Sequence, residues 1–435
     1  MNTEILAEIK PFSSEWWDFF LKENGNFTET KVFKGVISDA DVVLLNEEIV
    51  KILQELYLLK TNKYGFRIYL DGKEQDNTFM TNLFENHAPF DNENITEYFN
   101  RVFSDKKFGM IINHTEKFSE ELARNVLLKI QPLLDKVGIP LTGLSAHILI
   151  GNYGWTPLGI HQDTRGENVI HFHLGPGPKI MYNWNEEDYK ELTGKKDNNK
   201  DVEPLLPYAE SYPFETGDLY YMPWNKYHIG FSDQFSVGLT IWFNNPTKRS
   251  FTTAILDALH LQHLNEDDEI LSPNKDKDID LTFENIKSVL NLNENLRQLT
   301  FIDLLKYLHK EYKLAILSNG GWASIPVTLS DKIKYEIDNY EILDNKKIIT
   351  PYPFKTFYEK IDDELVIFAR GYKVKIRYHD ELINIIDKLN QNKEELVTDL
   401  LSNLIVDWPV EAGLYFLSLL YDKRAINIVE TNQLK

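Results

Sequence analysis

The 435-residue chain contains no cysteine. Disulfides, zinc ribbons, iron–sulfur clusters and thiol nucleophiles are therefore excluded, and a bound metal must be held by histidine, carboxylate or neutral oxygen ligands. Long apolar runs are also missing, because no stretch approaches the roughly eighteen apolar residues of a membrane-spanning helix. The N-terminal segment MNTEILAEIKPF lacks the basic and apolar parts of a secretion signal. We therefore expect a cytoplasmic protein without a membrane partner.

Basic residues are in the minority, with 47 Lys and Arg against 67 Asp and Glu, and the formal net charge is −20. Nucleic-acid binding depends on Lys and Arg that displace phosphate counterions, so we expect no nucleic-acid partner. An acidic surface attracts basic molecules over long distances, although acidity also serves solubility alone. A basic peptide or protein is thus one expected partner, and simple solubility is the alternative explanation.

Composition and length indicate a globular protein of several domains. Hydrophobic residues make up 43% and charged residues 26%, which gives enough apolar surface to fold. The length exceeds what one hydrophobic core supports. The pattern divides the chain into an α/β region (1–143), a β-rich module (144–246), a helical connector (247–320) and a C-terminal domain (321–435).

The first two regions differ in the spacing of their apolar residues. Helical spacing marks Asp41–Leu59 and Glu120–Val137. From Leu144 to Phe243 the pattern changes to short runs of Ile, Val, Tyr, Phe and Trp separated by Gly and Pro, which predicts an all-β module, either a closed or a double-sheet barrel. The polar segment Glu191–Glu203 predicts an insertion over the mouth of this barrel, either a lid or a surface loop.

The last third of the chain mixes strands and short helices behind an acidic connector, Asn265–Asp280. The final helix carries no Lys or Arg along its length, so core packing is favoured over DNA reading. Three helices with flanking strands suggest a winged-helix-like domain. The expected strands are Ile325–Leu329, Glu364–Tyr378 and Ala425–Val429, and the expected helices are Glu381–Leu389, Leu396–Ile405 and Glu411–Asp422.

The residues with metal-binding chemistry lie in the β-rich module. His161 and Asp163 stand two positions apart at the end of a predicted strand, where alternate residues share a face. His228 follows a turn and precedes another strand, which makes it the natural third ligand. Two histidines and one carboxylate that leave coordination positions open suit Fe(II) that must also bind an organic oxidant and O₂.

Other histidines offer a rival arrangement. His171 and His173 form a His-x-His pair that could hold a metal, but no glutamate follows in the next five residues to complete such a ligand set. If Asn168 and the alternate residues after it face the pocket, these two histidines face away from it. We interpret them, like His147 and His263, as structural histidines.

The module resembles the JmjC-type, cupin-fold 2-oxoglutarate oxygenases. The resemblance is carried by the combination of residues rather than by any single one. Beside the three proposed ligands it includes Thr156, Pro157, Asn168, Lys179, Gly217, Asp218, Tyr221, Pro223 and Leu239–Trp242.

This resemblance implies an α+β protein whose core is a double-stranded β-helix, or jelly roll, with helical flanks and a winged-helix-like C-terminal domain. It also implies Fe(II) as cofactor and 2-oxoglutarate and O₂ as cosubstrates. Lys179 and Thr156 are then expected to bind the distal carboxylate of 2-oxoglutarate, and Asn168, Thr240 and Trp242 to occupy pocket positions that line the cosubstrate or back the metal. No residue beyond the metal ligands is expected to act catalytically.

The layout is similar to that of the bacterial ribosomal-protein oxygenases within this family, in which the connector supports a homodimer. The leading hypothesis is therefore a dioxygenase that hydroxylates a side chain of a peptide or protein. The alternatives are an oxygenase acting on an amino acid or metabolite, and a non-catalytic cupin sensor coupled to a winged-helix binding module.

Overall fold

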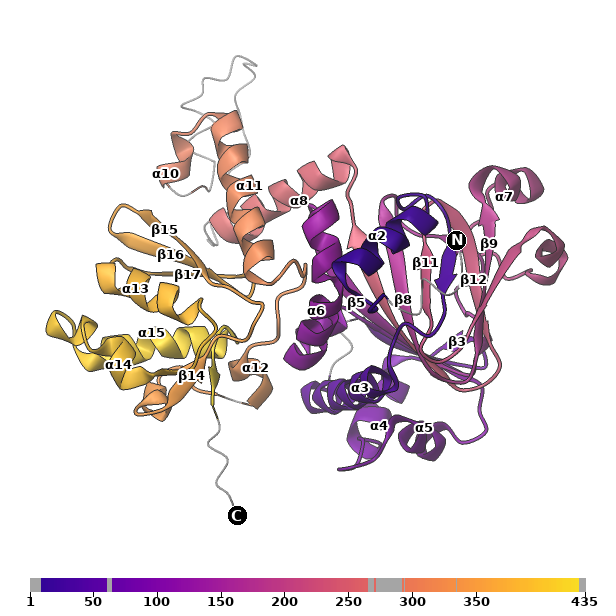
Figure 1. Cartoon of the computed structure of the whole chain (residues 1–435), viewed down its shortest axis with the longest axis horizontal. Coiled ribbons are helices and arrows are strands. Elements are labelled where there is room, and N and C mark those ends of the chain that lie inside the picture. Colours follow the sequence, from indigo (N-terminus) through magenta and orange to yellow (C-terminus); the bar gives the residue numbers. More distant parts are fainter. Residues whose placement is uncertain are drawn as a thin grey trace.

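The computed structural model describes residues 9–60, 65–264, 270, 292, 294–333 and 335–429. Figure 1 shows a larger lobe built on β-sheets and a smaller C-terminal lobe beside it. Apart from residue 270, the predicted connector Asn265–Asp280 lies outside the described residues. Within the described ranges no helix is long and apolar enough to cross a membrane.

The predicted N-terminal helices are confirmed. α3 (Asp39–Leu59) begins two residues earlier than expected, where the Ser38 side chain accepts a hydrogen bond from the Asp41 amide and satisfies a free N–H of the first turn. α6 (Glu120–Val137) has the predicted bounds and is capped in the same way by Ser119. The remaining helices of this region are α2 (Ser14–Glu23), α4 (Asn77–Asn86) and α5 (Ile95–Phe103).

The larger lobe contains an eight-stranded sheet in the order β1-β11-β8-β13-β5-β4-β2-β3. Strands from the N-terminal region thus extend the sheet formed by the β-rich module. The bounds are β1 Lys31–Phe33, β2 Phe66–Leu70, β3 Lys73–Glu74, β4 Phe108–Asn113, β5 Leu144–Gly151, β8 Glu167–Pro176, β11 Leu219–Met222 and β13 Ser236–Asn244.

A second, five-stranded sheet has the order β10-β9-β12-β6, with β7 also paired to β12. All its strands come from the β-rich module. The bounds are β6 Gly154–Trp155, β7 His161–Gln162, β9 Lys179–Asn185, β10 Glu210–Phe214 and β12 Lys226–Ser232. The strand pairs of the two sheets are antiparallel, so the lobe is α+β with antiparallel sheets.

The predicted polar insertion Glu191–Glu203 runs between β9 and β10. It begins inside α7 (Glu186–Thr193) and ends at a short 3₁₀ helix, Glu203–Tyr208. Its middle is fixed, because Asn199 and Ile160 exchange backbone hydrogen bonds of 2.8 and 3.0 Å. The insertion is therefore attached directly beside β7.

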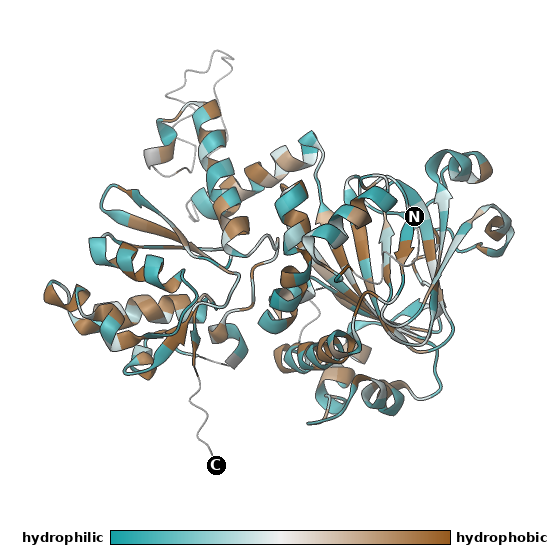
Figure 2. Cartoon of the chain, in the orientation of Figure 1, coloured by the Kyte–Doolittle hydropathy of each residue, from teal (hydrophilic) through white to brown (hydrophobic). Residues whose placement is uncertain are grey.

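The two faces of the large sheet have different chemistry. Its outer face packs with the N-terminal helices into one apolar core, to which Ile170 and Phe172 belong. In Figure 2 the strands of this lobe are accordingly rich in brown, apolar residues. The inner face turns Val169 and His171 toward a cavity. Our expectation that Ile170 and Phe172 face the pocket is wrong, because helices cover the outer face and require the apolar residues there.

The C-terminal lobe has its own apolar core, built from two three-stranded sheets and the three predicted helices. The predicted strand Ile325–Leu329 is wrong: residues 325–328 form no strand, and α12 begins at Leu329. The bounds are β14 Lys347–Ile349, β15 Phe357–Ile361, β16 Glu364–Ala369, β17 Tyr372–Arg377, β18 Glu395–Leu396, β19 Asn427–Ile428, α12 Leu329–Ile333, α13 Asp380–Leu389, α14 Val397–Leu401 and α15 Val410–Asp422.

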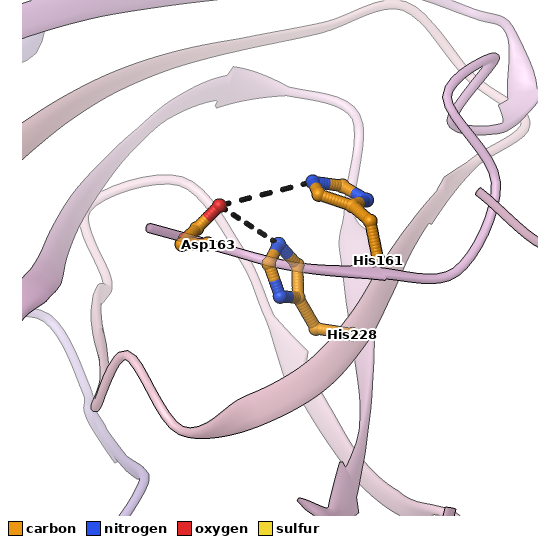
Figure 3. A group of neighbouring side chains, drawn as sticks. All are labelled: His161, Asp163 and His228. Atoms are coloured by element: carbon orange, nitrogen blue, oxygen red, sulfur yellow. Dashed lines mark ion pairs between the residues drawn. The ribbon is translucent and has the colours of Figure 1, made fainter. Parts of the chain in front are cut away.

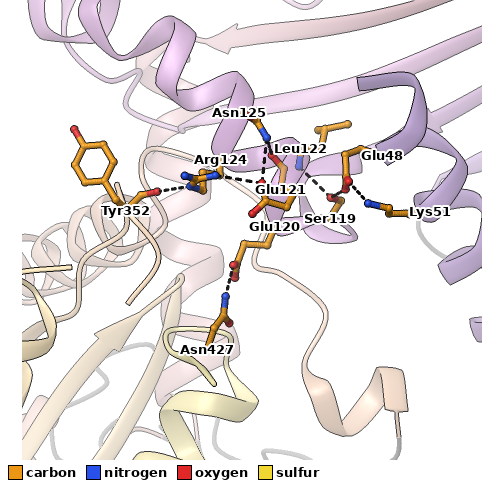
Figure 4. Close-up of polar contacts among 10 residues, drawn as sticks. All are labelled: Glu48, Lys51, Ser119, Glu120, Glu121, Leu122, Arg124, Asn125, Tyr352 and Asn427. Atoms are coloured by element: carbon orange, nitrogen blue, oxygen red, sulfur yellow. Dashed lines mark hydrogen bonds and ion pairs between the residues drawn. The ribbon is translucent and has the colours of Figure 1, made fainter. Parts of the chain in front are cut away.

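The start of α6 joins the lobes (Figure 4). Glu120 accepts a hydrogen bond of 2.7 Å from Asn427 and pairs with the buried Arg370 at 3.0 Å. Arg124 donates to the Tyr352 carbonyl at 3.0 Å. Trp322, Val327 and Phe354, which belong to the last third of the chain, are part of the core of the larger lobe. The lobes therefore share both polar and apolar contacts.

A buried carboxylate organises the helices between the lobes, α8 (Lys248–His263), α10 (Glu294–Arg297) and α11 (Phe301–Ser318). Glu311 on α11 contacts His263 at 2.7 Å and accepts from Tyr307 at 2.6 Å, and Lys373 on β17 pairs with it. Burial opposes ionisation of Glu311, but these partners outweigh it and lower its pKa to about 2. The ionised carboxylate therefore stabilises the folded state.

Replacing Glu311 with glutamine should lower the free energy of unfolding by roughly 3 kcal/mol at pH 7, because Lys373 would be left without its counter-charge. The folded-state pKa is depressed, so the difference from the parent should shrink as pH falls from above about 4.5 toward 2. Thermal unfolding at several pH values measures this, with the exposed Glu341→Gln as the matched control. An equal loss in both variants would contradict the assignment.

Candidate metal centre

Strand pairing brings the three predicted ligands together. β7 and β12 are antiparallel, and His161 stands directly opposite His228 in their register. Side chains paired across two antiparallel strands point to the same face, and Asp163 follows two residues after His161. Figure 3 shows the two imidazoles converging on the Asp163 carboxylate.

The distances are those of a compact cluster. Asp163 Oδ1 lies 3.8 Å from His161 Nε2 and 3.9 Å from His228 Nε2, and one ligand atom from each residue lies within 4.8 Å of the others. Ligands about 2.1 Å from a common ion stand roughly 3 to 4 Å apart. Within the described residues, no other group of three or more histidine, aspartate or glutamate side chains brings its ligand atoms within 4.8 Å of one another.

The backbone sets which imidazole nitrogen faces the cluster. His161 Nδ1 lies 2.9 Å from the Gly159 carbonyl, and His228 Nδ1 lies 3.3 Å from the Lys226 carbonyl. Each carbonyl accepts a hydrogen bond from the Nδ1–H group, so the lone pair of a neutral ring remains on Nε2. Both rings therefore present a ligand atom to the position beside Asp163, and the donor set fits a divalent metal.

Burial makes charge costly at this cluster. It lowers the pKa of His228 well below its ordinary value, and neighbouring His161 lowers it further. Burial raises the pKa of Asp163 to about 6, although His161 opposes this rise. Burial thus disfavours the charged forms of both Asp163 and His228, and a bound divalent metal would relieve this condition by compensating the carboxylate.

The cluster forms part of the wall of a cavity of about 280 Å³ between the two sheets. A volume of this order accommodates a small organic molecule. Among the other predicted site residues, Thr156, Lys179, Thr240 and Trp242 also line this cavity.

The chain resembles ribosomal oxygenase structures. Escherichia coli YcfD matches with 16% identity, 95% of this chain, 98% of the other and a TM-score of 0.48. The YcfD complex with cobalt and 2-oxoglutarate matches at 15% identity, the same coverages and TM-score 0.48. The non-heme alpha-ketoglutarate-dependent carbocyclase SnoK matches at 15% identity over 54% of this chain and 87% of its own, with TM-score 0.32.

No family model and no curated protein matches the chain. The TM-scores of 0.48 and 0.32 are too low to transfer an activity, so function is inferred from the side chains of the site.

Lys179 is the lysine or arginine residue of the cavity wall that lies closest in sequence to the three proposed ligands. It is only 5% exposed, yet within the described residues it makes no hydrogen bond or ion pair with any side chain. Gly230 leaves the space for it, because a Cβ on Gly230 would lie 3.1 Å from Lys179 Cε. A buried ammonium without a counter-charge is costly, so an anionic ligand is expected beside it.

Thr156 lies beside Lys179 but is already occupied. Its hydroxyl donates to the Gly230 carbonyl at 3.0 Å and accepts from the Gly230 amide at 3.2 Å. Thr240 is likewise engaged, with its Oγ1 2.9 Å from His171 Nδ1. Both residues therefore line the cavity while bonded to the protein itself.

Asn168 does not line the cavity. Its side chain accepts a hydrogen bond from the Trp224 amide at 3.2 Å and borders a separate surface hollow. The predicted pocket role is wrong, for the same reason as the facing of β8. The opposite residue set, including His171, faces inward, and His171 Nε2 is buried without a partner.

His147 also lines the cavity, although we expected an ordinary structural histidine. Its two ring nitrogens lie 3.0 Å from Asn113 Oδ1 and Ser145 Oγ, and the ring packs 4.2 Å from that of Trp242. Burial lowers the pKa of His147 to about 3, so the ring is neutral. It forms a satisfied, uncharged part of the wall.

Tyr153 was missed by the sequence reasoning. Its hydroxyl is buried without a hydrogen-bond partner, and Lys179 Nζ lies 5.9 Å from the centre of its ring. A buried unsatisfied hydroxyl is unfavourable unless a ligand completes it. Tyr153 does not itself line the cavity, but its unsatisfied hydroxyl makes it a candidate second donor near Lys179, and no motif in the sequence distinguishes it from other tyrosines.

Replacing Tyr153 with phenylalanine should raise the stability of the ligand-free protein by about 1 kcal/mol, because an unsatisfied hydroxyl is removed. The same change should weaken 2-oxoglutarate binding roughly five- to tenfold, the value of one lost hydrogen bond. Thermal unfolding and anaerobic titration with Fe(II) present measure the two effects. Increased stability with unchanged affinity would show that the hydroxyl does not bind the cosubstrate.

Proposed function

We propose that this protein is an Fe(II)- and 2-oxoglutarate-dependent dioxygenase that hydroxylates a side chain of a peptide or protein. One observation carries the proposal: Nε2 of His161, Nε2 of His228 and Oδ1 of Asp163 converge in the wall of a cavity that the buried Lys179 also lines. Two imidazoles and one carboxylate form the donor set typical of non-haem Fe(II) oxygenases, and they leave positions for two further ligands.

The residues around the cavity would have separate roles in this reaction. His161, Asp163 and His228 would hold Fe(II), and the Gly159 and Lys226 carbonyls would keep the rings oriented. Lys179 would compensate the distal carboxylate of 2-oxoglutarate. With Fe(II) bound, 2-oxoglutarate and O₂ would yield succinate and CO₂, and one oxygen atom of O₂ would be inserted into a C–H bond of the substrate. The apolar wall around Trp242 would help to exclude water from this step.

We also propose that the module 144–246 is a double-stranded β-helix. Along the chain its strands switch repeatedly between the two sheets: β5, β8, β11 and β13 lie in one, and β6, β7, β9, β10 and β12 in the other, with β9 and β10 adjacent in the same sheet. Under this proposal 1–143 supports the module, 247–320 is a connector able to form a homodimer, and 321–435 is a winged-helix-like domain. Its last helix buries Leu414, Phe416 and Leu417, which supports an architectural role.

A macromolecular substrate is favoured by the extent of the lobe around the module. β2, β3 and β4 widen the large sheet well beyond the strands that hold the cluster. The acidic surface would attract a peptide or protein that is basic overall.

The test is an anaerobic titration of Fe(II) and 2-oxoglutarate, monitored by the visible charge-transfer band of the ternary complex. A band in the parent supports the proposal, and no band would refute it in favour of a non-catalytic sensor. Succinate release in air with a gain of one oxygen on peptides, but not on free amino acids, would separate the peptide substrate from a small metabolite.

A further inference from the structure

A second cation, Arg67, lies in the wall of the same cavity. It sits on β2 at a distance in sequence from every proposed ligand. In the antiparallel register Arg67 is opposite Ile111 of β4, which is in turn opposite Leu149 of β5. All three side chains line the cavity, so the inner face of the extended sheet carries Arg67 to the site.

Arg67 lacks a counter-charge. Its Nε is buried without a hydrogen-bond partner, and within the described residues no carboxylate oxygen lies within 4.0 Å of its guanidinium nitrogens. Burial raises the pKa of its neighbour Tyr69, and the charge of Arg67 and a hydrogen bond with it oppose this rise, while the Tyr69 hydroxyl also donates to Glu74 at 3.0 Å. This neutral hydroxyl does not neutralise the guanidinium. A guanidinium partly removed from water is stable only with an anionic or strongly accepting partner, so one is expected in the cavity.

The other charges of the proposed complex balance without Arg67. A divalent iron, ionised Asp163, the two carboxylates of 2-oxoglutarate and Lys179 sum to zero. Glu167 is the other carboxyl in the cavity wall. Glu167 makes no ion pair within the described residues. The guanidinium of Arg67 is therefore left over.

Within the described residues, the side chains that line the cavity around Arg67 carry no competing charge. Asn113 and His147 beside it are bonded to each other, and His147 is neutral. Ile111, Leu149 and Trp242 complete this part of the wall with apolar surface. A carboxylate entering here would find one planar donor group in a dry setting, which is the geometry that guanidinium–carboxylate pairs favour.

We propose that Arg67 binds a carboxylate of the substrate, so that the residue presented to the metal centre is anionic. This inference rests on the proposed function and adds the substrate class to it. The carboxylate belongs either to an acidic side chain or to a chain terminus. A target that is basic overall, as the surface charge favours, would carry this acidic group at the modified residue.

The test uses three probe peptides on the full chain loaded with Zn(II), which has no redox chemistry, and 2-oxoglutarate. The probes are acetyl-glycyl-glutamyl-glycine amide, its glutamine counterpart, and the glutamine peptide with a free C-terminal acid. Their dissociation constants are measured by saturation-transfer difference NMR. We expect a carboxylate-bearing probe to bind the parent at least tenfold more tightly than the neutral amide, and the probe that does so identifies the source of the carboxylate.

Arg67→Met should abolish that preference and leave the 2-oxoglutarate dissociation constant within twofold of the parent. Arg67→Lys should retain part of the preference. Arg165→Met removes an exposed cation near Trp224 that does not line the cavity, and it should retain the full preference. Circular dichroism checks that each variant is folded.

The inference is overturned if the parent shows no preference, if Arg67→Met and Arg67→Lys both leave it unchanged, or if Arg67→Met weakens 2-oxoglutarate binding tenfold or more. The last result would make Arg67 a cosubstrate ligand instead. Failure of the proposed function is recognised separately, by the absence of the Fe(II) and 2-oxoglutarate band in the parent, and the inference falls with it.

Discussion

Replacing His161 with alanine should abolish the charge-transfer band and reduce succinate formation by at least about 10³-fold. The imidazole supplies one of three protein ligands, and its Nε2 is oriented toward Asp163 by the bond from Nδ1 to the Gly159 carbonyl. Two remaining ligands bind a divalent metal much more weakly than three, and the open face would no longer be defined. Anaerobic spectroscopy measures the band, and a coupled assay measures succinate.

His173→Asn is the matched control, because it tests the rival His171 and His173 pair. His173 is fully buried, and its Nε2 lies 2.7 Å from the Gly177 carbonyl, away from the proposed ligands. The asparagine should cost about 1 to 2 kcal/mol of stability through the altered hydrogen bond and should keep the band. A band that survives in His161→Ala and disappears in His173→Asn would transfer the metal site to the other pair.

Lys179→Met should weaken 2-oxoglutarate binding by roughly 100-fold and leave Fe(II) affinity within a few fold of the parent. A buried cation paired with a carboxylate in a partly dry cavity contributes on the order of 3 kcal/mol to affinity, and each 1.4 kcal/mol corresponds to tenfold. Methionine keeps the length and apolar character of the side chain, so packing against Gly230 is preserved. Titration of 2-oxoglutarate into the Fe(II) protein gives the affinity.

Lys226→Met serves as the control for the loss of one positive charge near the centre. Lys226 lies on the same sheet but bonds to Asn185 and does not line the cavity. Only its backbone carbonyl contacts His228, and the substitution leaves that carbonyl in place. Similar losses of affinity in both variants would indicate a general electrostatic effect and contradict a specific role for Lys179.

The metal ligands could be proposed from sequence because their chemistry is local. A histidine and an aspartate two positions apart share a face of a strand whatever the rest of the chain does. The third ligand, His228, required one further expectation, that a histidine between a turn and a hydrophobic strand would lie beside the first two. The structure brings these three side chains together.

The facing of β8 could not be obtained in this way. Between Asn168 and His173, each of the two sets of alternate residues contains both polar and apolar side chains. The sequence pattern therefore does not show which set faces the pocket. The decision depends on the helices that cover the outer face of the sheet, where Ile170 and Phe172 are needed, and on the polar ligands that the inner face must meet. Asn168 was consequently assigned to the wrong side.

Arg67 and Tyr153 were missed for a different reason. Neither belongs to a motif, and Arg67 reaches the cavity only because β2 and β4 are added to the edge of β5. Such pairing across distant segments cannot be inferred from the spacing of residues in one sequence. The buried, unsatisfied polar atoms that draw attention to both residues become visible only with coordinates.

Trp322, Val327 and Phe354 restrict how the protein can be divided. A chain ending at residue 320 would remove these three side chains from the core of the larger lobe and would leave Glu120 without Arg370 and Asn427. Exposure of this apolar surface would favour aggregation of the shortened protein. Evolutionary exchange of the C-terminal lobe for another module would therefore require simultaneous changes on α6. We expect the two lobes to be inherited together for this reason.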